Sequence, residues 1–208
     1  KNSNSMWNDV MVGTQTLSDH WNFKPGSSLS LWTYTNADEV ELVLNGKTIG
    51  RKTNDKANPK NRNKIKWDKV NYEEGYLEAI ARNNGKVVAR HKIETVGKAV
   101  RLTSVSDNAN WKADGTDLQH IRFTAVDRKG RRVQGANQLM TFEVEGPAEI
   151  VGVINGDIAS HEMTVGNRRS LFKGAATVIL RSSGIPGKVK LKVSADGLKC
   201  KDVELITQ

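Results

Sequence analysis

The feature that most constrains the fold is an Asn-Gly pair that occurs twice between segments of alternating apolar and polar residues. In residues 38–52, Val40, Leu42 and Leu44 share one face of an expected strand, and Glu39, Glu41 and Val43 share the other. Asn45-Gly46 follows directly. Successive side chains of a strand point to opposite faces, and Asn-Gly adopts the positive φ angles that a tight type I′ turn requires. The pattern predicts a β-hairpin with one buried face.

The same pattern returns further along the chain. Residues 76–95 alternate on either side of Asn84-Gly85, and shorter alternating segments lie at 27–35 and 63–70. Helical periodicity is nearly absent. Several short strands joined by Gly- and Asn-rich turns are typical of a β-sandwich, which we expect to cover residues 20–97.

A second set of strands begins after Gly97, where the alternation starts again. The segments expected to form strands are 99–106, 121–126, 139–146, 148–156, 175–183, 187–197 and 200–207. About seven strands in roughly 110 residues is the usual number for an immunoglobulin-like sandwich. The sequence therefore predicts an all-β protein with two tandem immunoglobulin-like β-sandwich domains, at residues 20–97 and 98–208.

The charge of the chain indicates a basic surface without identifying a nucleic-acid site. The net charge is +9, and eight Lys or Arg residues fall within residues 51–69. A nucleic-acid site needs such charges on one face with stacking aromatic side chains. This segment offers only Trp67, and its Asn residues and Pro59 are typical of a solvated loop. We therefore expect no nucleic-acid partner. The sequence contains no run of about 18 apolar residues, so we also expect no membrane span.

Residue types that carry chemistry are scattered. The four histidines lie far apart, and no phosphate-binding loop or nucleophile elbow occurs. Acids such as Asp114 and Asp117 fall in expected turns, and the single Cys200 has no partner for an internal disulfide. The sequence predicts no catalytic residue, no metal site and no cofactor. Asn155-Gly156-Asp157 predicts a turn, with a calcium or sugar contact at Asp157 as the alternative.

Two aromatic side chains leave an alternative open. Trp32 and Tyr34 are two positions apart on one expected strand, so they share a face. They would either pack against a neighbouring sheet or domain or form a platform on which an oligosaccharide stacks.

A long segment closely resembles a known family. Residues 19–52, DHWNFKPGSSLSLWTYTNADEVELVLNGKTIGRK, are similar to the first sandwich after the catalytic barrel in bacterial glycoside hydrolase family 2 enzymes, the β-galactosidase-like members. The resemblance lies in His20, Trp21, Asn22, Phe23, Trp32, the run from Tyr34 to Leu42, Leu44, Asn45, Gly46, Lys47 and Gly50. Residues 102–157 are similar to the final immunoglobulin-like domain of those enzymes. The basic insertion at residues 51–64 is longer than in the family pattern.

The resemblance implies a non-catalytic region of a glycosidase. In the family the catalytic glutamates lie on a preceding barrel, and the acid/base follows an Asn, whereas no Asn-Glu dipeptide occurs here. Residues 1–19 would connect the two sandwiches to the barrel, which would be their partner in the same parent chain. Trp7, His20, Trp21 and Phe23 would pack between domains. The resemblance also implies a location in the periplasm or at the surface of a bacterial cell.

Two other functions are consistent with paired sandwiches. One is a pair of carbohydrate-binding modules that use Trp32, Tyr34 or the basic segment at residues 51–69. The other is an adhesin-type surface repeat of the invasin kind, which residues 113–133 resemble more weakly.

Overall fold

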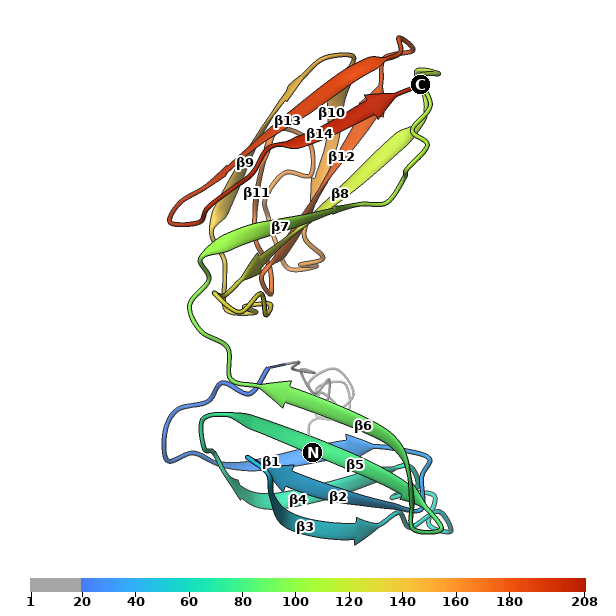
Figure 1. Cartoon of the computed structure of the whole chain (residues 1–208), viewed down its shortest axis with the longest axis vertical. Helices are drawn as coiled ribbons and strands as arrows, with labels where there is room; N and C mark the ends of the chain where they lie inside the picture. Colours follow the sequence, from blue (N-terminus) through green and yellow to red (C-terminus); the bar gives the residue numbers. More distant parts are fainter. Residues whose placement is uncertain (1–19) are drawn as a thin grey trace, which may run out of the picture. The chain divides into compact units, whose positions relative to one another are not determined.

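The computed structural model describes residues 20–208, which form an all-β chain of fourteen strands (Figure 1). The chain divides into two compact units between Thr95 and Val96. The boundary expected from the sequence, between residues 97 and 98, lies two residues further along. No helix among the described residues is long and apolar enough to cross a membrane. The predicted all-β sandwich class is confirmed.

The first unit contains two antiparallel sheets of unequal size. Four strands form one sheet in the order β3-β2-β5-β6, and β1 and β4 form the other. The strands are β1 (Ser28–Tyr34), β2 (Glu39–Leu44), β3 (Lys47–Thr53), β4 (Lys64–Asn71), β5 (Tyr76–Asn83) and β6 (Lys86–Glu94).

Both predicted hairpins are confirmed. Asn45 and Gly46 have φ angles of 50° and 84°, and Asn84 and Gly85 have φ angles of 48° and 77°. Each pair joins antiparallel neighbours, β2 to β3 and β5 to β6. The positive φ angles match the twist of the flanking strands, which is why this dipeptide marks the turns so clearly.

The core of the first unit lies between its two sheets. Leu42 and Leu77 contribute from the larger sheet and Trp67 from the smaller one, all at most 5% exposed. Gly50 on β3 is needed beside Trp67, because a Cβ at this position would lie 3.0 Å from the indole ring. The alternating apolar residues of β2 lie in this core, but Val43 on the opposite face of β2 is also buried, so the strand is buried on more than the one face expected.

Trp21 is the anchor of the segment that precedes β1. Its side chain is fully buried, and its indole N–H donates to the Glu73 carbonyl over 2.8 Å. Its backbone N–H donates to the Glu94 carbonyl at the end of β6, also over 2.8 Å. Phe23 and Tyr72 pack against its ring, each with a centroid distance of 5.4 Å. These contacts fix the place where the chain enters the first unit.

The second unit contains two four-stranded antiparallel sheets, in the orders β10-β12-β8-β7 and β11-β9-β13-β14. The strands are β7 (Arg101–Ser106), β8 (Leu118–Val126), β9 (Leu139–Glu145), β10 (Ala148–Ile154), β11 (Arg168–Ser170), β12 (Ala175–Ser182), β13 (Gly187–Ala195) and β14 (Val203–Thr207). The sequence predicts seven of these eight strands. It misses β11, which has only three residues and therefore no alternation to detect.

Aromatic side chains fill the core of the second unit and close one of its ends. Phe123 of β8 and Phe142 of β9 meet across the two sheets with ring centroids 5.6 Å apart. At the end where the chain terminates, the buried Trp111 donates its indole N–H to the Asp117 carbonyl over 3.0 Å. The backbone of Gln208 pairs with Trp111 and Ala113. The last residue of the chain is thus part of the fold.

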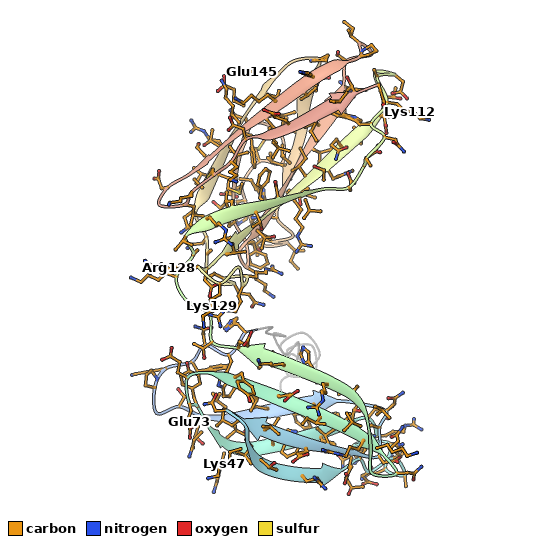
Figure 2. All side chains as sticks on the ribbon, viewed as in Figure 1. Lys47, Glu73, Lys112, Arg128, Lys129 and Glu145 are labelled. Carbon is orange, nitrogen blue, oxygen red and sulfur yellow. The ribbon has the colours of Figure 1, made fainter. Side chains whose placement is uncertain are left out.

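The turn after β8 is built around a buried carboxylate. Asp127 is 2% exposed and accepts hydrogen bonds from the backbone amides of Gly97, Lys129 and Arg131 and from the Arg131 guanidinium. Arg128 and Lys129 of the same turn point outward (Figure 2). Burial raises the pKa of Asp127, but the Arg131 side chain and the surrounding amides outweigh it and hold the pKa well below its usual value.

Replacing Trp21 by Ala should destabilise the first unit by about 3–5 kcal/mol, because a fully buried indole leaves a cavity and a lost hydrogen bond. Trp32, which is only partly buried, is the matched control, and its change to Ala should cost about 1 kcal/mol. Hydrogen exchange of the β2 and β5 amides measures the loss of stability in each variant, with the β8 and β12 amides as internal references. Equal losses for the two variants would show that Trp21 does not anchor the unit.

Replacing Asp127 by Asn should lower the stability of the second unit by about 2–3 kcal/mol at pH 7, because the charged acceptor of five hydrogen bonds is lost. Since the folded-state pKa lies below the ordinary value of 3.8, the wild-type stabilisation is present above about pH 4 and is lost as the pH falls further. The difference between the two proteins in urea unfolding should therefore shrink between about pH 4 and pH 2. A constant difference over that range would contradict this role.

Candidate functional site

A groove of about 760 Å³ runs along β1 in the first unit. Six consecutive residues of β1, residues 29–34, line one side of it. Leu77 and Ala79 of β5 and His91 and Ile93 of β6 line the other side. His20, Trp21 and Phe23 also border the groove. The lining of the groove is mostly apolar.

Trp32 and Tyr34 lie on the outer face of the small sheet, opposite Lys66 and Lys64 of β4. Tyr34 is 60% exposed, and Trp32 is partly buried. The ammonium groups of Lys64 and Lys66 lie 5.1 Å and 6.0 Å from the centre of the Trp32 ring. At these distances a cation is attracted to the ring face. The two aromatic side chains share a face as expected, and their contact with a carbohydrate stays a prediction.

The residues predicted to pack between domains have separate surroundings. The Trp21 side chain lies in the core of the first unit itself. His20 is partly buried and Phe23 is 38% exposed, with ring centroids 6.4 Å apart at the border of the groove. Trp7 lies outside the described residues, as does the connector at residues 1–19. Packing against another domain stays a prediction for these positions.

One buried side-chain amide, that of Asn54, holds the two ends of the loop in the basic segment together. Asn54 is 5% exposed and donates to the carbonyls of Thr35 and Ala37 over 3.1 Å and 2.9 Å. Its side-chain oxygen accepts from the Asn63 amide over 3.0 Å. The ends of the segment belong to β3 and β4, so only residues 54–63 form the loop. Asn54 therefore fixes both ends of this insertion while its lysines remain exposed.

A second ordered loop, residues 155–167, joins β10 to β11 in the second unit. The side chain of Arg169 is 4% exposed beneath it. Its guanidinium donates to the Glu162 carbonyl over 2.8 Å and to the Asn155 side-chain oxygen over 2.7 Å. The Glu162 carboxylate in turn accepts hydrogen bonds from the hydroxyl and amide of Ser170. The Ser170 hydroxyl, with the Ser170 amide and Arg169, lowers the pKa of Glu162 although burial opposes the shift.

The loop carries apolar side chains on the outside of this polar base. Ile158 is fully exposed, and Met163 and Val165 are more than 70% exposed. The predicted turn at Asn155-Gly156-Asp157 is confirmed, with a φ of 78° at Gly156 and a 3.0 Å hydrogen bond from the Asp157 amide to the Asn155 side chain. The burial of Arg169 could not be predicted, because a buried arginine and an exposed one look alike in a polar run of sequence.

Several acidic side chains of the described residues accept hydrogen bonds within the fold. Asp114 accepts from the amides of Thr116 and Asp117 and from the Thr116 hydroxyl, and these bonds lower its pKa. Each described carboxyl for which a pKa shift is resolved is shifted downward. Within residues 20–208 no group of three or more His, Cys, Asp or Glu side chains is arranged to hold a metal ion.

Two family models match the chain. Residues 102–204 match the glycoside hydrolase family 2 C-terminal domain 5, and residues 26–89 match a domain of unknown function (DUF4982). Each match falls within one of the two compact units of the structure.

Individual proteins are similar over almost the whole chain. The β-galactosidase BoGH2A of Bacteroides ovatus is 38% identical over 196 residues, which is 94% of this chain and 22% of that protein. A β-glucuronidase of Formosa agariphila is 30% identical over 79% of this chain and 18% of its own length. A solved family 2 structure from Bacteroides cellulosilyticus superposes with a TM-score of 0.86 and 32% identity, over 92% of this chain and 24% of its own.

The chain thus spans about a fifth to a quarter of the length of these relatives. Each of its two units matches one of the two family models, and its fold superposes on a solved member of the family. The chain therefore belongs to glycoside hydrolase family 2 and corresponds to the C-terminal β-sandwich domains of its bacterial members.

Proposed function

We propose that this chain is the non-catalytic C-terminal part of a longer β-glycosidase, in which its two sandwiches brace the catalytic barrel and contribute to the rim of the substrate cleft. The observation that carries the proposal is the extent of the match, which covers nearly all of this chain but only 22% of a β-galactosidase. Hydrolysis of a β-galactoside or a β-glucuronide would then depend on residues elsewhere in the parent protein.

The electrostatics of the carboxyl groups support a structural role. Glycoside hydrolysis needs one carboxyl with a raised pKa to protonate the leaving group, opposite a second carboxyl across the sugar bond. Here the Arg131 side chain and backbone amides lower the pKa of Asp127, and the Ser170 hydroxyl, with the Ser170 amide and Arg169, lowers the pKa of Glu162. Carboxyls of this kind hold turns and loops in place and are poor proton donors at neutral pH.

The loop at residues 155–167 supports a contact with another part of the parent protein. Contacts between Arg169 and Glu162 fix the inner side of the loop. On its outer side, three apolar side chains are exposed to solvent: Ile158, Met163 and Val165. Exposed apolar groups that gather on an ordered element commonly mark a protein interface. We take this loop as the surface that the second unit offers to the catalytic barrel.

The purified chain should not hydrolyse chromogenic β-galactosides or β-glucuronides, because the proposal places both catalytic glutamates on the barrel. A family 2 β-galactosidase assayed in parallel is the positive control. In addition, the coding sequence upstream of Lys1 should encode a barrel with two such glutamates. Turnover by the purified chain would contradict the proposal, and so would an upstream sequence that contains only further sandwiches.

Replacing Arg169 by Met should release the loop and lower the stability of the second unit by about 2–3 kcal/mol, since Glu162 and Asn155 lose a charged partner. Amide hydrogen exchange of residues 155–167 should rise. Arg168→Met, at the exposed neighbouring position, is the matched control and should change stability by less than about 0.5 kcal/mol. The same exchange rates in both variants would show that Arg169 does not support the loop.

A further inference from the structure

One end of the second unit is strongly basic. Three short segments form this basic end: residues 97–101, 127–133 and 172–174. They contain two, four and one Lys or Arg residues, and their single acidic residue is Asp127. Asp127 is buried and forms an ion pair with Arg131. The other cations of these segments therefore have no acidic residue within the segments to balance them.

The three segments lie together because the strands that they adjoin meet at one end of their sheet. β7 begins at Arg101, which pairs with Val126 at the end of β8. β12 begins at Ala175, which pairs with Thr124 of β8. The segment before β7, the turn after β8 and the turn before β12 are thus neighbours in space, although up to about seventy residues separate them in the sequence.

The buried carboxylate of Asp127 fixes the backbone from which these cations project. It accepts hydrogen bonds from the backbone amides of Gly97, Lys129 and Arg131, so it joins the first of the three segments to the second. Arg128 and Lys129 point outward from this turn (Figure 2). A surface held on a fixed backbone loses less conformational freedom when it binds a partner than a surface on a mobile loop does.

Most cations of the basic end lack a carboxylate partner. No acidic side chain within residues 20–208 forms an ion pair with five of them: Lys98, Arg101, Arg128, Lys129 and Lys173. Elsewhere on the same unit such pairs do occur, for example between Lys190 and Asp202 over 3.0 Å. Like charges that lie close together repel one another, and an anion that binds between them turns this repulsion into attraction.

The side chains around these cations indicate what kind of anion they suit. None of the large apolar side chains that are exposed in the described part of the chain belongs to the three segments, whereas a protein interface normally has an apolar centre. The aromatic residue among them, Phe172, is partly buried, and the Lys173 ammonium lies 5.6 Å from its ring centre. The basic end therefore offers no free aromatic platform for the bases of a single-stranded nucleic acid.

We propose that the basic end of the second unit binds an anionic polysaccharide through the carboxylates or sulfate esters of its sugar residues. The planar guanidinium of Arg128 can donate two parallel hydrogen bonds to the oxygens of such a group. A polymer that carries acidic groups at regular intervals would contact several of the cations at once, and the linked contacts would strengthen one another. This surface differs from the groove along β1 and from the loop at residues 155–167, and the inference does not rest on the proposed function.

The test measures binding of the full chain to three polysaccharides by calorimetry. Dextran and dextran sulfate share a backbone, so the difference between them reports the acidic group, and polygalacturonate replaces sulfate by carboxylate. We expect binding to at least one of the two anionic polymers and no binding to dextran. The polymer that binds more tightly identifies the preferred acidic group.

A matched pair of double variants locates the site. Arg128→Gln with Lys129→Gln should weaken binding roughly tenfold or more, because two charged contacts are lost while the backbone amide that pairs with Asp127 remains. Lys60→Gln with Arg62→Gln removes the same two charges from exposed positions of the first unit. This control should change the affinity less than about threefold, since salt screens charges that are distant from the site. Thermal unfolding should match the unchanged protein in both cases.

Four results would overturn the proposal. The two double variants could bind equally well, which would assign binding to net charge alone. Dextran could bind as well as dextran sulfate, or neither anionic polymer could bind. Double-stranded DNA could bind more tightly than both anionic polysaccharides, which would assign the basic end to a nucleic acid.

Discussion

The buried indole of Trp21 is the contact on which the organisation of the first unit depends. It joins the Glu73 carbonyl, the end of β6 and the rings of Phe23 and Tyr72 at one point. Because this point is fixed, the short turn that follows can set the start and direction of β1, and β1 in turn positions β4 and the basic loop. One side chain thus links the segment before the sandwich to both of its sheets.

The second unit uses buried polar groups for the same purpose. Asp127 holds the turn after β8 by hydrogen bonds from three backbone amides, and Arg169 holds the loop before β11 by hydrogen bonds to the Glu162 carbonyl and the Asn155 side chain. A buried charge needs partners of this kind to be tolerated, so each of these residues favours one conformation of its loop. The outward-facing Ile158 and Met163 gain a defined position from this polar support.

Much of the fold follows from the sequence, and the reasons are local. The two Asn-Gly turns and the alternation on β2 and β5 mark hairpins, since each signal lies within a few residues. The short β11, the buried state of Arg169 and the two-stranded second sheet could not be predicted in this way, because they depend on pairing between distant segments. Trp21 illustrates the limit well: its size predicts burial, while its partners at Glu73 and Glu94 are more than fifty residues away.

The close contact between Gly50 and the Trp67 ring limits how the core of the first unit can change. Any other residue at position 50 would place its Cβ 3.0 Å from the indole, so a larger residue there requires a smaller ring or a shifted strand. Natural or designed variants of this core should therefore replace the two positions together.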